Sequence, residues 1–379
     1  MEAQTKQRIA LSTYFFLSGF GFATWTSRIP TIKDMLQLNE AELGSILMVM
    51  PISSLLGLPL SGFLVSKFET RFPLIIAVCL YVLALFSIGL AENVLALSIS
   101  IFCVAFFMRI VNISMNTQAI SIQKIIGKKI NGSFHALWSM GGIVGVGCTT
   151  LMIVLDVSLF MHFVIFACMA IPIAFFAFQH LLKNDIAPSG NKLILSKPDP
   201  YIMSLGFLIL FAAICEGGMF DWSGVYFNEV VKTEVFTFGF LLFMISMTIS
   251  RFASDWFIHR LGIKRTFVIS AMTITIGIAI AVIFPTFYMA LLGFSLVGLG
   301  VAPVVPMALV QAGDSKKYSP GIAVSIISTY GTSGMLIGPP MIGYLAHAFD
   351  LRTSFIFLII MGLAIIPVSR LFFRIKERN

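Results

Sequence analysis

Charged residues are scarce in this chain. Asp, Glu, Lys and Arg make up 11% of its 379 residues, whereas hydrophobic residues make up 58%. About a quarter of the residues of an average soluble protein are charged, so this composition excludes an ordinary soluble globular domain. Twelve apolar segments long enough to cross a bilayer follow one another from Ala10 to Phe373. We therefore predict a polytopic membrane protein.

The chain also lacks the motifs of common enzymes and ATPases. It contains no GxxxxGK[ST] nucleotide-binding loop, no HExxH motif and no cysteine and histidine cluster at metal-binding spacing. We expect no enzymatic activity, no cofactor and no metal, so that energy comes from an ion or solute gradient. The five cysteines all lie within apolar segments, which indicates packing residues and not disulfides. They are Cys79, Cys103, Cys148, Cys168 and Cys215.

The placement of the basic residues predicts the orientation of the chain. Its formal charge is +8, and 19 Lys and Arg residues fall in loops on one side of the predicted spans against 4 on the other. Basic loops are retained in the cytosol, so we expect both termini to be cytoplasmic. This topology explains the positive charge without nucleic acid. The expected partners are membrane lipid, a small solute and a proton, and we expect a monomer.

The predicted spans are α-helices, because a chain in hydrocarbon must pair its own backbone groups and the period-two alternation of barrel strands is missing. The first span resembles a signal peptide, but it is close to full length and has no small-residue cleavage pattern. We therefore predict twelve transmembrane helices. They cover residues 10–28, 42–66, 72–91, 94–122, 132–155, 157–180, 201–227, 234–258, 266–284, 286–311, 320–347 and 351–373.

The chain divides into two similar halves. A polar segment at 183–200, rich in Pro, Ser and charge, predicts a cytoplasmic linker between six-helix bundles at 1–182 and 201–379. The loop that begins SGFLVSKF at Ser61 matches the loop that begins SDWFIHRL at Ser254, 193 residues later. The same offset relates Gly141 and Gly145 to Gly334 and Gly338. We predict parallel, pseudo-symmetric repeats.

These loops resemble the major facilitator superfamily, whose loop pattern is a Gly, then an Asp, a cation, a second Gly and further basic residues. Ser66 and Glu69 depart from that pattern in the first copy, and Asp255 and His259 depart in the second. The resemblance covers the whole chain and implies two bundles related by an axis along the membrane normal. The matching or gate-forming residues are Gly62, Lys67, Arg71, Asp255, Arg260, Gly262, Lys264 and Arg265.

Three further segments narrow the resemblance. They are EGGMFDWSGVYF from Glu216, TWTSRIP from Thr24 and HALWSMGG from His135. They look like a branch of bacterial inner-membrane permeases whose substrates are mostly unassigned and, more distantly, like fucose permeases. The basic loop residues would then pair with helix ends and acids when the inner gate is shut, although topology alone also explains their charges.

Arg109 is the most costly residue in the predicted fourth helix. A buried arginine costs about 2.5 to 3.5 kcal/mol on insertion scales unless it faces water or a partner. Asn112 and Asn116 follow at positions that share its face. This pattern predicts a polar stripe that binds solute, with the guanidinium on a carboxylate, phosphate or sugar hydroxyl. Alternatively, these three side chains tie helices together.

Glu216 is the candidate proton carrier. It lies in an apolar part of the seventh helix and is followed by Gly217 and Gly218. Burial disfavours the charged form of a carboxylate, which suits a group that takes up and releases a proton. The alternative is an ion pair with Arg109 or Arg251, and such a pair could also break and reform during transport. Asp221, near the outer end, is the second and weaker candidate.

Two residues of the fifth helix complete the predicted solute site. His135 and Trp138 share one face, and Trp138 could stack on a sugar or aromatic solute. The alternative for His135 is a hydrogen-bonded packing residue, and the alternative for Trp138 is a tryptophan at the membrane interface. We interpret Trp25 as an interfacial residue and His162, which has apolar neighbours in sequence, as structural.

The pattern as a whole predicts a secondary active transporter that alternates between inward-open and outward-open states about a central site. We expect Arg109, Asn112 and Asn116 to bind a small polar or anionic solute, Glu216 to couple a proton, and the reaction to be symport. One alternative is a proton-driven exporter of drugs or metabolites. Another is a membrane sensor or assembly protein that does not transport.

Overall fold

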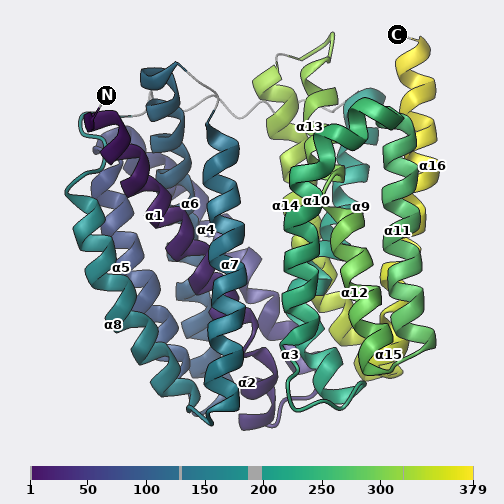
Figure 1. The fold of residues 1–379 in the computed structure, drawn as a ribbon, viewed down its shortest axis with the longest axis horizontal. Coiled ribbons are helices and arrows are strands. Elements are labelled where there is room, and N and C mark those ends of the chain that lie inside the picture. Colours follow the sequence, from purple (N-terminus) through teal and green to yellow (C-terminus); the bar gives the residue numbers. More distant parts are fainter. Residues whose placement is uncertain (1, 128–129, 187–198, 319, 379) are drawn as a thin grey trace. The chain divides into compact units, whose positions relative to one another are not determined.

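The structure, a computed structural model, describes residues 2–127, 130–186, 199–318 and 320–378, and these residues form helices and no strands (Figure 1). Ten helical segments among them are long and apolar enough to cross a membrane, and Phe238–Ser254 is a shorter apolar helix. With the first helix, Glu2–Thr26, these segments give the twelve predicted spans. The all-α fold with twelve transmembrane helices is therefore confirmed.

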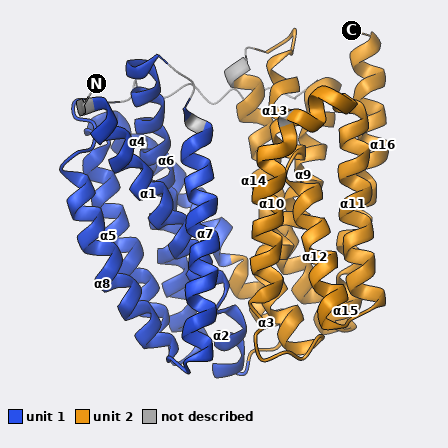
Figure 2. Ribbon diagram, viewed as in Figure 1, with its two compact units in different colours: residues 1–37, 49–192 blue, residues 38–48, 193–379 orange. Residues whose placement is uncertain are grey.

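The helices fall into two compact units, coloured separately in Figure 2. Unit 1 comprises residues 1–37 and 49–192, and unit 2 comprises residues 38–48 and 193–379. The helices of unit 1 are α1 (Glu2–Thr26), α2 (Ile29–Met35), α4 (Val49–Lys67), α5 (Arg71–Ile88), α6 (Val94–Ile126), α7 (Asn131–Val154) and α8 (Leu159–Phe178). Those of unit 2 are α3 (Glu40–Leu47), α9 (Pro200–Glu229), α10 (Phe238–Leu261), α11 (Ile263–Ile283), α12 (Phe287–Val301), α13 (Val304–Gly313), α14 (Pro320–Ala348), α15 (Leu351–Ser354) and α16 (Ile356–Arg378).

The second predicted span is broken at Met48, between α3 and α4. Pro51 has no backbone N–H for the carbonyl of Leu47, which removes a helical hydrogen bond at this point. The short helix α3 packs on α14 within unit 2. Ser45 Oγ lies 2.9 Å from Tyr344 Oη. A proline thus ends one helix before the next begins, although the apolar run continues through the break.

Glycines let α1 and α7 of unit 1 approach closely. A Cβ added to Gly141 would lie 2.1 Å from the carbonyl oxygen of Phe16, and one added to Gly145 would lie 2.7 Å from that of Phe20. Both distances are far below van der Waals contact, so only glycine fits between these backbones. The two helices lie side by side in Figure 1.

The same arrangement recurs between α9 and α14 of unit 2. A Cβ on Gly334 would lie 2.4 Å from the carbonyl oxygen of Leu210, and one on Gly338 would lie 2.8 Å from that of Ile214. Each of these glycine contacts corresponds to a glycine contact of unit 1 that lies about 193 residues earlier in the chain. The predicted internal repeat is therefore present in the packing of the two bundles.

Helix α9 forms the centre of unit 2, since 78% of its most apolar stretch is buried. Two of its aromatic side chains donate hydrogen bonds inside the bundle. Trp222 Nε1 donates to the carbonyl of Pro339 at 2.9 Å, and Tyr226 Oη donates to the carbonyl of Ala281 at 2.8 Å. These bonds fix α9 against α14 and α11, and so fix the position of Glu216.

Candidate functional site

Arg109 lies on α6 and is held by a single residue of α4. Its Nε donates to Ser54 Oγ at 2.7 Å and to the Ser54 carbonyl at 3.3 Å. A Cβ added to Gly57 of α4 would lie 3.4 Å from the Cβ of Arg109, so the two helices pack closely at this point. Among the described residues, the terminal amines Nη1 and Nη2 have no hydrogen-bond partner, and the side chain is half-buried. The guanidinium is thus held by Ser54 through its Nε.

The two asparagines predicted beside Arg109 differ in their bonding. Asn116 Nδ2 donates to the backbone carbonyl of Asn112 at 2.8 Å, so this amide is occupied within its own helix. The side chain of Asn112 is half-buried and has no partner in the described part of the chain. Asn112, three residues beyond Arg109, is therefore the member of the pair with free donors and a free acceptor.

His135 and Trp138 lie on α7. The His135 side chain is exposed, and its ring meets the ring of Phe15 edge-on at 5.5 Å. The Trp138 ring is half-buried and lies 5.7 Å from the ring of Phe22 on α1. Both rings thus pack partly on α1.

Glu216 of α9 forms an ion pair with Arg251 of α10. The distance from Arg251 Nη2 to Glu216 Oε1 is 3.2 Å, and Glu216 is 7% exposed. The sequence left two arginines as possible partners, and within unit 2 the structure shows Arg251. The Arg251 side chain is 37% exposed, so the cation reaches from the buried acid toward the surface of the unit.

Asp221, the second acidic residue of α9, lies five positions beyond Glu216 and is half-buried. It makes no hydrogen bond or ion pair with any residue that the structure describes.

The basic residues of the two loops form separate local clusters. Lys67, five residues beyond Gly62, lies over the rings of Phe63 and Phe68, and Arg71 pairs with Glu69 at 2.6 Å. In unit 2, Arg260 lies over the Trp256 ring, Lys264 lies 3.7 Å from Glu377, and Arg265 is exposed. Gly262 takes a φ of 78°, which favours glycine. Asp255 is on α10, and its side chain lies outside the described residues.

One polar contact of unit 1 could not be anticipated from the sequence. Arg28 is 4% exposed, its Nε donates to His162 Nδ1 at 3.1 Å, and its Nη2 donates to the Val157 carbonyl at 2.8 Å. His162 was expected to lack polar company, because its neighbours in sequence are apolar. Its partner lies 134 residues away, and no local signal reports such a contact.

Among the described residues, no group of three or more His, Cys, Asp or Glu side chains is placed to hold a metal ion. Two ionisable residues within the helices have polar partners there: Arg109 bonds to Ser54, and Glu216 forms an ion pair with Arg251.

Known proteins are similar in sequence to this chain over nearly its whole length. An uncharacterised MFS-type transporter of Yersinia pestis is 30% identical over 92% of this chain and 91% of its own. The membrane protein MosC of Rhizobium meliloti is 28% identical over 96% of this chain and 90% of its own. These relatives are full-length matches and not local ones.

Solved structures show the same fold. The nucleoside transporter NupG aligns with a TM-score of 0.77 at 16% identity, covering 98% of this chain and 99% of its own. A bacterial homologue of the human lysosomal transporter Spinster aligns with a TM-score of 0.73 at 15% identity, covering 98% of both chains. The sequence pattern of the Major Facilitator Superfamily matches residues 10–333 and 264–379. With twelve helices in two repeated bundles, the chain belongs to the Major Facilitator Superfamily of membrane transporters.

Proposed function

We propose that this protein is a monomeric secondary active transporter of the bacterial inner membrane. It carries a small anionic solute together with a proton in the same direction. Membership of the superfamily and its transporter relatives support the transport role. The solute, the proton and the direction are our inference from the charged residues within the helices.

The observation that carries this proposal is the Glu216–Arg251 pair. A buried carboxylate is expensive unless a cation lies beside it, and Arg251 supplies that cation at 3.2 Å. A proton delivered to Glu216 removes the negative charge and with it the attraction that holds Arg251. Proton binding at Glu216 would therefore weaken the contact between α9 and α10. Symport needs such a link between proton binding and a change in helix packing.

Arg109 is the proposed solute-binding residue. Its Nε is engaged by Ser54, so the fork of Nη1 and Nη2 is presented in a fixed orientation. Two parallel N–H groups match the two oxygens of a carboxylate or phosphate, and a guanidinium stays charged at any physiological pH. The free amide of Asn112 on the same helix face would bind a neighbouring hydroxyl or carbonyl. An organic anion with an adjacent polar group fits this set.

We expect Arg109→Lys to raise the KM for an anionic solute at least tenfold, because a lysine offers a point charge and no fork. A tenfold loss corresponds to about 1.4 kcal/mol of binding free energy. Ser54→Ala should have a smaller effect of the same kind, since it frees the guanidinium to rotate. Thr117→Val, on the same helix, is the control, because the Thr117 hydroxyl donates only to the Ile113 carbonyl. A KM unchanged in Arg109→Lys would exclude Arg109 from the solute site.

The test of the proposal is uptake by purified protein in proteoliposomes with an imposed inward proton gradient. Labelled gluconate, glucose and uridine represent an organic anion, a neutral sugar and a nucleoside; uridine is included because NupG is a nucleoside transporter. We expect gluconate-type anions to accumulate. Accumulation only with an outward proton gradient would indicate the exporter, and no movement of any solute would indicate a protein that does not transport.

A further inference from the structure

Asp185 lies in the segment that leaves α8, beyond the helical part of the first bundle. Helix α8 ends at Phe178, and the chain then turns, with Asn184 in the left-handed region at a φ of 56°. Leu181 and Leu182 are 2% and 8% exposed, so this segment packs into unit 1. The turn brings the Asp185 side chain back onto the bundle, where it is 8% exposed.

The carboxylate of Asp185 binds the residue at the start of α5. Its Oδ1 accepts from the backbone N–H of Thr70 at 3.0 Å, and its Oδ2 accepts from the Thr70 hydroxyl. Thr70 is the N-cap residue of α5, and its own side chain makes no cap hydrogen bond. The first N–H groups of a helix need acceptors. Asp185 accepts from the Thr70 N–H, and also from the Thr70 hydroxyl, from 115 residues away.

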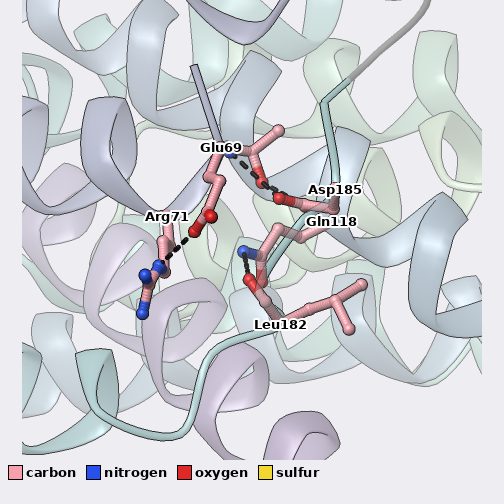
Figure 3. A network of polar contacts seen from close by, with 6 residues as sticks. Glu69, Arg71, Gln118, Leu182 and Asp185 are labelled. Carbon is pink, nitrogen blue, oxygen red and sulfur yellow. Dashed lines mark hydrogen bonds and ion pairs between the residues drawn. The ribbon is translucent and has the colours of Figure 1, made fainter.

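A second contact holds the same segment, as Figure 3 shows. Gln118 of α6 is fully buried, and its Nε2 donates to the Leu182 carbonyl at 3.1 Å. Beside it, Arg71 pairs with Glu69 and lies over the ring of Phe178 at the end of α8. The α4–α5 turn, α6 and the exit from α8 thus meet at one polar cluster.

The matching position of the second repeat is held differently. Gln311 lies 193 residues after Gln118, and its Oε1 accepts from Lys376 Nζ at 2.6 Å, while Lys376 also lies 3.3 Å from Asp314. Helix α16 continues to Arg378, so Lys376 reaches Gln311 from a regular helix. In unit 1 the helix has already ended, and Lys183 at the matching position is exposed. Asp185 instead holds this segment by its bond to Thr70. The asymmetry lies where the chain must continue into the second half.

We propose that Asp185 is an anchor residue, which fastens the start of the inter-bundle segment to the α4–α5 turn so that α4, α5, α6 and α8 keep one arrangement at this end of unit 1. The superfamily pattern has an Asp in this turn, whereas Ser66 stands there and its hydroxyl donates to the Phe63 carbonyl of its own helix. Asp185 provides a carboxylate to the turn from another part of the chain. The anchor acts through hydrogen bonds and does not need to exchange a proton.

The charge state of Asp185 determines whether Asp185→Asn raises or lowers the Tm. Burial raises the pKa of the Asp185 carboxyl, the bonds from Thr70 oppose that rise, and the charge of Glu69 adds to it. A raised pKa means that folding disfavours the ionised form, so charge at this position reduces stability above that pKa. Asp185→Asn removes the charge, keeps an acceptor for the Thr70 N–H and turns a donor toward the Thr70 hydroxyl. We expect its Tm at pH 7 to equal or exceed that of the natural protein.

Asp185→Ala removes both acceptors and leaves two buried donors of Thr70 without partners. We expect it to lower the apparent Tm in detergent by roughly 5 °C and to speed hydrogen exchange at the Thr70 amide. Combined with Thr70→Val, it should lower the Tm by less than the sum of the two separate effects, because the residues share one interaction. Glu92→Ala, which removes an exposed carboxylate of unit 1, is the control.

Exchange and Tm do not depend on any solute, so they test the anchor even if the proposed function fails. An unchanged Thr70 exchange rate in Asp185→Ala, or strictly additive effects with Thr70→Val, would overturn the proposal. For transport, we expect Asp185→Ala to lower the maximal rate of gradient-driven gluconate uptake several-fold with the KM unchanged, and Asp185→Asn to restore it. Failure of Asp185→Asn to restore uptake would show that charge matters here and would also contradict the anchor.

Discussion

We expect replacement of Glu216 by Gln to abolish accumulation of solute against its gradient but to leave exchange of solute across the membrane intact. Glutamine has nearly the same shape and stays near Arg251, but it cannot bind or release a proton at physiological pH. The variant therefore resembles the protonated state of the natural protein at all times. Measured in proteoliposomes with an inward proton gradient, accumulation should fall at least tenfold, which is about 1.4 kcal/mol in the coupling free energy. Counterflow without a gradient should continue.

The control for this experiment is Glu234→Gln, which changes an exposed carboxylate of the same unit. Asp221→Asn is measured in parallel because Asp221 is the second candidate for proton binding. Full accumulation by Glu216→Gln, with loss in Asp221→Asn, would move the coupling role to Asp221. Full accumulation by both variants would remove proton coupling through α9.

We expect Gly141→Ala and Gly334→Ala each to prevent normal assembly of one bundle. The added methyl would lie 2.1 Å from a backbone carbonyl oxygen of α1 in the first case and 2.4 Å from one of α9 in the second. Backbone atoms cannot rotate away as a side chain can, so whole helices must separate. Overpacking usually lowers the free energy of unfolding by about 1–3 kcal/mol. We expect a clash with the main chain to lower it by about 3 kcal/mol or more. We expect little folded protein after size-exclusion chromatography in mild detergent.

Gly147→Ala on α7 is the matched control, because a Cβ there would meet nothing within 4 Å. Alanine is the better helix former by about 1 kcal/mol, so this variant should be at least as stable as the natural protein. If Gly141→Ala and Gly147→Ala had the same Tm, close packing of α1 on α7 would not explain the repeated glycines. Equal effects of Gly141→Ala and Gly334→Ala would support equivalent packing in the two repeats.

The fold was predictable because its signals are local and repeated. Long apolar runs fix the number of helices, since a chain without the alternation of barrel strands can satisfy its backbone in lipid only as helices. The glycines at 141, 145, 334 and 338 share one offset, and they lie at two equivalent helix contacts. The division into bundles at 1–182 and 201–379 stays a prediction. The break at Met48 was missed because hydrophobicity continues through it, although Pro51 was the available signal.

The candidate site was less accessible from the sequence because its contacts join distant residues. Burial cost singled out Arg109 and Glu216 as unusual, but it could not choose between Arg109 and Arg251 as the partner of Glu216. That choice depends on which turn of α10 faces α9, and a helix period alone does not specify it. The contact of Arg28 with His162 and that of Thr70 with Asp185 were missed for the same reason.

The roles given to the site residues stay predictions that the structure makes specific. Asn116 bonds to its own helix, so Asn112 is the better candidate for a solute contact. Arg109 presents a free fork because Ser54 holds its other edge. These details determine which variants are informative, and sequence alone would have treated Asn112 and Asn116 alike.

In a symporter, each solute molecule crosses the membrane together with a proton in the same direction. The most direct measurement follows internal pH with a trapped dye while gluconate enters proteoliposomes that carry no initial pH difference but hold a solute gradient. Our account predicts that inward solute flow acidifies the lumen, and that Glu216→Gln allows solute entry without acidification. Solute entry by the natural protein with no change in internal pH would contradict it.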